Sequence, residues 1–87
     1  MANNNDQHPI PGLGQSPSDT FAKAFNEGRR LHSQGRLVDA VSAYVRALKI
    51  EPENTDLLND MGAAYLDLGQ LPPSQEALEK ALALRAR

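Results

Sequence analysis

The sequence AVSAYVRALKIEP, residues 40–52, decides the fold of this chain. Its apolar residues recur at i, i+4, i+7 and i+8, which is the spacing of one stripe on an amphipathic α-helix. These residues are Ala40, Tyr44, Ala47 and Leu48. Pro52 ends the helix, because proline has no N–H to continue the hydrogen bonds and disfavours helix at the preceding residue. The two alanines allow a neighbouring helix to approach closely, so this helix needs partners on its flanks.

Three further helices are expected around it, from the same apolar spacing and from residues that start or stop helices. The four expected helices span residues 19–34, 37–51, 55–68 and 72–87. Gly35 and Gly69 are natural stops, because glycine adopts the left-handed conformation that ends many helices. Asn54 or Thr55 can cap the third helix, and the missing N–H groups of Pro72 and Pro73 cost little in a first turn.

The two halves of the chain repeat one another. Gly28 and Gly62 are 34 residues apart, and so are Gly35 and Gly69. The same offset relates Leu37 to Leu71, Ala43 to Ala77, Ala47 to Ala81 and Leu48 to Leu82. A period of about 34 residues is typical of stacked helix–turn–helix units. Glycine at positions 28 and 62 lets the two helices of each unit cross closely, and stacking of units buries their apolar faces.

At these residues the chain resembles the tetratricopeptide repeat (TPR) family. The matching positions are Gly28, Ala40, Tyr44, Ala47 and Pro52 in repeat one and Leu58, Met61, Gly62, Tyr65 and Ala81 in repeat two. Ser74 stands where the family has alanine. The resemblance implies an all-α fold of two tandem helical hairpins in a superhelix. Repeat one would span residues 21–54 and repeat two residues 55–87.

Residues 1–18 precede the repeats and differ from them in composition. Asparagine, glutamine, proline and glycine dominate this segment and favour turns over helix. We therefore expect a disordered tail. An alternative is that Ile10 and Leu13, its sizeable apolar residues, dock as a short peptide into a groove.

The composition argues against several classes of function. The formal net charge is −2, which gives no indication of a nucleic-acid or anionic-membrane partner. The chain has no cysteine, so it forms neither disulfides nor thiolate metal sites. The first residues lack the basic and apolar regions of a secretory signal, and no stretch is long and apolar enough to span a bilayer. We therefore expect a cytoplasmic protein.

Catalysis has little support in the sequence. His8 and His32 have no nucleophile at a recognisable spacing. Three acidic residues share the third expected helix, but no glycine-bearing loop holds them and no histidine accompanies them, so a solvated face is the better interpretation. These residues are Asp56, Asp60 and Asp67. We expect no catalytic residue, no cofactor and no metal site, and the chain is not expected to be an enzyme.

The resemblance implies that the first helix of each repeat lines a concave groove for an extended peptide. The residues at the lining positions are Ala22, Phe25, Arg29, His32, Ser33, Asp56, Asn59, Ala63, Leu66 and Asp67. Among them, Phe25 and Leu66 are expected as apolar anchors. Arg29, Asp56 and Asp67 are expected to select polar partners. The function predicted is non-catalytic binding of a peptide or protein.

Self-association is the alternative function. Residues 21–50 carry six basic side chains against two acidic ones, a net +4, whereas residues 51–79 carry seven acidic side chains and no basic ones. These charges are either solvated faces or the basis of an antiparallel pairing of two chains that salt would weaken. The last helix is apolar around much of its circumference, and no polar cap follows it. Either Ala77, Ala81 and Leu84 contact another subunit in a homodimer, or the chain is a fragment of a longer array.

Overall fold

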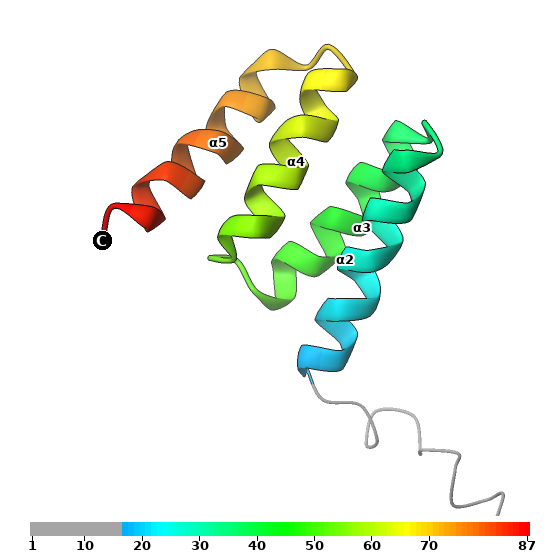
Figure 1. Ribbon diagram of the computed structural model, residues 1–87, viewed down its shortest axis with the longest axis horizontal. Coiled ribbons are helices and arrows are strands. Elements are labelled where there is room, and N and C mark those ends of the chain that lie inside the picture. Colours follow the sequence, from blue (N-terminus) through cyan, green and yellow to red (C-terminus); the bar gives the residue numbers. More distant parts are fainter. Residues whose placement is uncertain (1–16) are drawn as a thin grey trace, which may run out of the picture.

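The computed structural model describes residues 17–87, which form four α-helices joined by short turns (Figure 1). The helices are α2 (Pro17–Ser33), α3 (Leu37–Ile50), α4 (Thr55–Asp67) and α5 (Leu71–Arg85). Residues 17–87 contain no strand, which confirms the all-α prediction. Helix α2 begins two residues earlier than expected, at Pro17, a residue whose fixed φ suits a first helical turn. The remainder of the expected tail, residues 1–16, lies outside the described residues.

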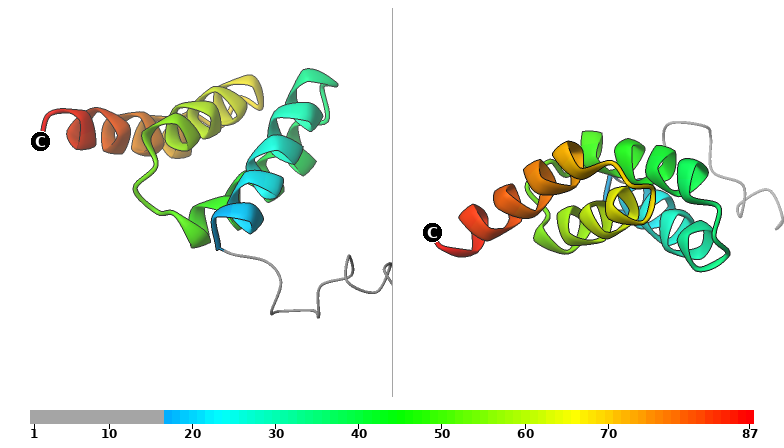
Figure 2. Two further views of the ribbon diagram at one scale, coloured as in Figure 1. Left: turned by 60° about the horizontal axis from the view of Figure 1, so that its bottom comes forward. Right: turned by 90° about the horizontal axis from the view of Figure 1, so that it is seen from above.

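The helices pair into two antiparallel hairpins, α2 with α3 and α4 with α5. Helix α4 packs on α3 and approaches α2, so the second hairpin stacks beside the first (Figures 1 and 2). Both hairpins turn at a glycine with positive φ, +78° at Gly35 and +79° at Gly69. The N–H of the next residue then donates to a carbonyl five residues back, at 2.9 Å in each turn. This left-handed termination confirms the predicted stops.

The two helices of each hairpin cross closely at a glycine of the first helix. A side chain of the second helix lies over this glycine, Tyr44 over Gly28 and Leu78 over Gly62. A Cβ at Gly28 would overlap the Tyr44 ring, and a Cβ at Gly62 would fall 2.6 Å from a methyl group of Leu78. The two crossings are the same contact, 34 residues apart. They explain in physical terms why glycine repeats at this position.

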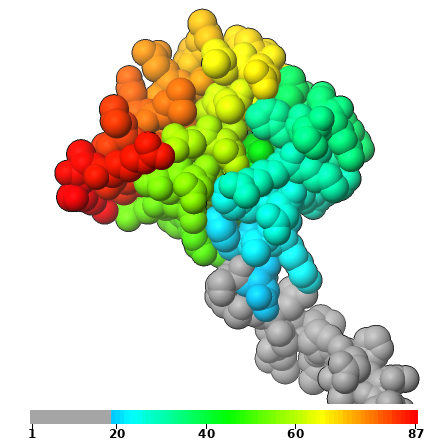
Figure 3. Space-filling view, in the orientation of Figure 1, coloured from blue at the N-terminus to red at the C-terminus, as the bar shows by residue number. Residues whose placement is uncertain are grey.

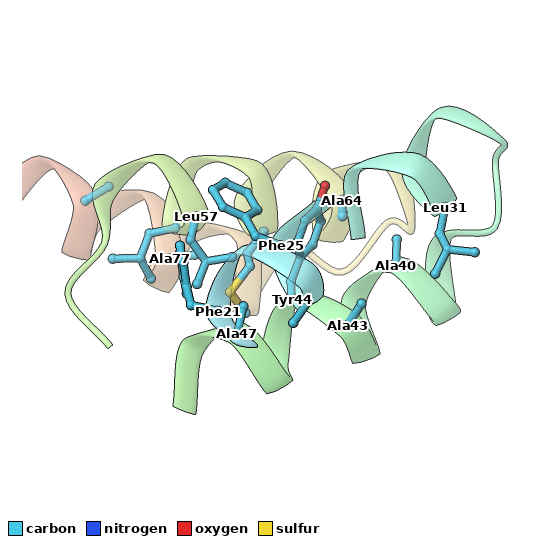
Figure 4. Packing of buried hydrophobic residues seen from close by; sticks show 14 residues of the cluster. Phe21, Phe25, Leu31, Ala40, Ala43, Tyr44, Ala47, Leu57, Ala64 and Ala77 are labelled. Carbon is cyan, nitrogen blue, oxygen red and sulfur yellow. The ribbon is translucent and has the colours of Figure 1, made fainter. Parts of the chain in front are cut away.

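The core runs through both hairpins and is built largely of alanines and aromatic rings (Figure 4). Tyr44 is fully enclosed, with 1% of its surface exposed. Its ring meets Phe25 edge-on at 6.1 Å between centroids, and Phe21 packs on Phe25 at 5.5 Å. Such tilted aromatic pairs add to the free energy gained by burial. Leu57 of α4 is also fully buried and joins the second hairpin to this core.

Side-chain hydrogen bonds fix the start of α4 and the position of α5. The Asn54 side chain accepts a hydrogen bond from the backbone N–H of Leu57 at 3.0 Å, which confirms the predicted cap. Pro72 and Pro73 lie in the first turn of α5, as expected. Ser74 is buried, and its hydroxyl donates to the carbonyl of Gly62 at 2.8 Å. The serine that replaces a family alanine therefore ties α5 to the backbone of α4.

Candidate partner-binding face

Two matching stripes of residues lie on the first helices of the two hairpins. On α2 they are Ala22, Asn26, Arg29 and Ser33, all exposed; on α4 they are Asp56, Asp60, Ala63 and Asp67, of which all but half-buried Asp60 are exposed. Their spacing, i, i+4, i+7 and i+11, places each set on one side of its helix. Arg29 reaches across to Asp60, so the two stripes adjoin. We call these eight residues the α2–α4 face.

The Arg29 guanidinium is the centre of this face. Its Nε donates to Oδ2 of Asp60 at 2.9 Å, and its Cζ lies 4.2 Å from the centroid of the Phe25 ring. The hydrogen bond to Asp60 is the main cause that raises the pKa of Arg29, against a smaller opposing effect of burial. The charge is held by both a carboxylate and an aromatic face, so the side chain is positioned while more than half of it stays exposed.

A second polar link joins the helices near their C-terminal ends. Nε2 of His32 lies 2.8 Å from Oδ2 of Asp67, and the imidazole stands edge-on to the Tyr44 ring at 6.3 Å. The Tyr44 hydroxyl is 3.5 Å from Nδ1 of His32. Burial first, and the nearby carboxylate of Asp60 second, raise the pKa of Tyr44 to about 12, so this phenol stays neutral at ordinary pH.

Most of the residues expected to line a groove belong to this face. Ala22, Arg29, Ser33, Asp56, Ala63 and Asp67 are members of the two stripes. His32 borders the face through its contact with Asp67, and Asn59 is half-buried. The two expected apolar anchors differ in exposure, since Phe25 is buried and Leu66 is exposed. The Phe25 ring is buried in the core beneath Arg29, and Leu66 lines a hollow at the far end of the second hairpin with Leu71 and Leu78.

Two residues of the face were missing from the predicted lining, Asn26 and Asp60. Each follows a predicted lining residue by four positions, and they are related by the 34-residue offset. The four-residue spacing and the 34-residue offset are the sequence features that could have identified both residues. Asp60 was assigned only to a solvated helix face, whereas the structure pairs it with Arg29.

The residues expected at a self-association contact lie on the side of α5 that faces the core. Ala77 and Ala81 are 6% and 1% exposed, because they pack in the core with α4, and Leu84 is half-buried against the same cluster. These small residues of α5 therefore pack inside their own hairpin. The exposed apolar side chains of this helix are Leu71, Leu78 and Leu82.

Two other kinds of feature were sought in the described part of the chain. Residues 17–87 hold no group of three or more histidine, aspartate or glutamate side chains that could bind a metal ion. None of the helices between Pro17 and Arg85 combines the length and the apolar character needed to cross a membrane.

The hairpin pair with a 34-residue offset defines an α-helical repeat protein that stacks helix–turn–helix units. Comparison with known proteins agrees with this class and names the family. The family model described as TPR repeat matches residues 28–69, which include both crossing glycines and both turn glycines. The match supports the TPR family assignment that the sequence pattern predicted.

One similar protein is the outer dynein arm-docking complex subunit 4 of Danio rerio. It is 34% identical to this chain over 56 residues. The match covers 64% of this chain and 12% of the relative, so this chain spans a small part of that protein's length. TPR repeats generally act as protein–protein interaction modules.

Proposed function

We propose that this chain is a non-catalytic binding module whose α2–α4 face holds an extended segment of another protein. The observation that carries the proposal is the alignment of two adjoining stripes, each of which has one exposed alanine among polar side chains. Ala22 and Ala63 are exposed and leave room for a peptide backbone to approach. Arg29 and Asp56, each two turns from the alanine of its own helix, offer hydrogen bonds at its sides. Peptides are commonly held in this way by a preformed helical surface.

The charge of the face indicates the chemistry of the segment. The face carries three carboxylates, those of Asp56, Asp60 and Asp67, and one guanidinium, that of Arg29, which is already paired with Asp60. The face is therefore acidic on its α4 side. A segment with lysine or arginine side chains complements it and would be steered toward it at low salt.

Selection of binders from a random peptide library, followed by NMR titration of the labelled chain, tests the proposal. We expect selected peptides to be rich in basic residues and to shift amide signals of α2 and α4. The substitution Ala63→Arg should weaken binding by roughly tenfold or more, because it places a bulky cation on the face. Ala83→Arg is the matched control, since Ala83 is an exposed alanine on α5.

Three results would refute this function. Signals that shift only on α3 and α5 would place the binding surface elsewhere. Equal affinity of the Ala63→Arg and Ala83→Arg variants would exclude the α2–α4 face. Selected peptides that are acidic or uncharged would refute the proposed charge preference. As a separate check of that preference, the variant Asp56→Asn should weaken the binding of basic peptides only.

A further inference from the structure

The outer surface of the second hairpin, on the side away from α3, exposes four leucines. They are Leu66 of α4 and Leu71, Leu78 and Leu82 of α5, and they are 54%, 59%, 41% and 67% exposed. Three of them line a shallow hollow of about 340 Å³ together with Ser74 and Gln75. We call these leucines the end face. Figure 3 shows α5, in orange to red, along one edge of the molecule. Large side chains gathered in this way on a surface mark a contact site.

The 34-residue offset indicates which kind of element fits the end face. The end-face leucines correspond to His32, Leu37, Tyr44 and Leu48 of the first hairpin. Those residues are buried or half-buried, on the side where α4 packs. Leu48, for example, lies in one hollow with Leu58 and Met61 of α4. The end face is thus the equivalent of the surface on which α4 packs, and no element within residues 17–87 covers it.

The opposite end of the molecule cannot supply that cover. Helix α4 contacts its neighbour with Leu57, Met61 and Ala64, which are all buried. The corresponding residues of α2 are Lys23, Glu27 and Arg30, which are all exposed. Glu27 is paired with Arg46. A head-to-tail stack would bury Lys23 and Arg30 against the end-face leucines of the next copy. Burial of unpaired charge is strongly unfavourable, so copies of this chain cannot stack head to tail.

We infer that the end face is the contact between two copies of this chain, with α5 packed against α5 of the partner subunit about a two-fold axis. A symmetric contact requires one surface to complement itself. The outer side of α5 carries Leu71, Gln75, Leu78, Leu82 and Arg85, at intervals of four, three, four and three residues. This is the spacing of a helix–helix seam.

The seam also fits an antiparallel arrangement. With the axis near Lys80, Leu78 lies opposite Leu82 of the partner subunit, and Gln75 lies opposite Arg85 of the partner subunit. Antiparallel helices align each C-terminus with the N-terminus of the other, which their dipoles favour. Each copy uses its own end face, so the assembly closes at two chains. The α2–α4 face is not part of the contact, and this inference stands apart from the proposed binding function.

Sedimentation equilibrium of the full chain over a wide range of concentrations tests the dimer. We expect the mass to rise from 9.5 kDa to a plateau at twice that value. The dimer should persist at high salt, because its contact is apolar. Leu82→Glu should raise the dissociation constant by roughly a hundredfold, since a symmetric contact loses the side chain twice. Val38→Glu is the matched control, because Val38 has the same 67% exposure on α3.

Each other outcome overturns the inference. A single-chain mass at every concentration would assign the end face to a different occupant, such as a helix of another protein. Masses that grow beyond two chains would indicate head-to-tail stacking. Equal effects of Leu82→Glu and Val38→Glu, or a dimer that salt dissociates, would place the contact on the charged faces instead. Circular dichroism checks that each variant is folded, and the milder Leu82→Gln replaces Leu82→Glu if that variant is not.

Discussion

The two hairpins of this chain have the same construction and differ in what surrounds them. Tyr44 and Leu78 occupy equivalent positions, each lying over the glycine at a helix crossing. Tyr44 is 1% exposed, whereas Leu78 is 41% exposed. The difference arises because α4 covers the first hairpin and no described element covers the second. Burial in this fold therefore depends on the neighbouring repeat as much as on the repeat's own sequence.

The contrast extends to the polar residues between the hairpins. Arg29 and His32 of the first hairpin bond to Asp60 and Asp67 of the second. The residues equivalent to Arg29 and His32 are Ala63 and Leu66, which are apolar. The first hairpin thus meets its neighbour through a core flanked by the Arg29–Asp60 ion pair and the His32–Asp67 contact, while the second offers an apolar surface. Successive faces of a repeat array can have different chemistry on one backbone plan.

Truncation of the two equivalent side chains should show the largest difference between the hairpins. Tyr44→Ala should lower the free energy of unfolding by about 3–5 kcal/mol, because it empties a fully buried site. Leu78→Ala should cost about 1–2 kcal/mol, since much of that side chain is already in water. Urea unfolding followed by circular dichroism, at a concentration where single chains prevail, measures both. Equal losses would mean that the cover provided by α4 contributes little.

Addition of a methyl group at the two crossings should give a smaller difference. Gly28→Ala should destabilise the chain by about 1–3 kcal/mol, because the enclosed Tyr44 ring cannot move away. At Gly62 the new methyl meets Leu78, whose exposed side chain can rotate. Alanine also gains about 1 kcal/mol over glycine inside a helix, so Gly62→Ala should be close to neutral. Thermal unfolding of the two variants compares them, and a costlier change at Gly62 would contradict this account.

The sequence was sufficient for the fold because the repeat depends on local rules. The glycine turns, the Asn54 cap and the prolines that start α5 act within one or two helical turns, and the 34-residue offset pairs the helices. Helix ends shifted by one or two residues, as at Pro17. Ends are the least determined part of a helix, because they fray and have few contacts.

The candidate site was less predictable, because it depends on which residues meet across helices. Position in the repeat identified Arg29 and Ala63, but it could not show that the Phe25 ring would turn into the core beneath Arg29. The segregation of basic and acidic residues was evident in the sequence. The sequence did not show that residues of opposite charge would pair within one chain. Arg29 of α2 pairs with Asp60 of acidic α4 within one molecule, although the two residues are 31 apart in sequence.

The ion pair between the hairpins should give the smallest effect of all. Arg29 and Asp60 are both partly exposed, so a double-mutant cycle with Arg29→Ala and Asp60→Ala should give a coupling energy of only about 0.2–1 kcal/mol. The cycle removes the separate contribution of Arg29 packing on Phe25, because that contact is lost in both arms that lack the arginine. The coupling should shrink as salt is added. A coupling of zero at low salt would leave the His32–Asp67 contact and the apolar contact of α3 with α4 as the links between the hairpins. The lack of a matching ion pair at the end face would then not weaken its hold on a neighbour.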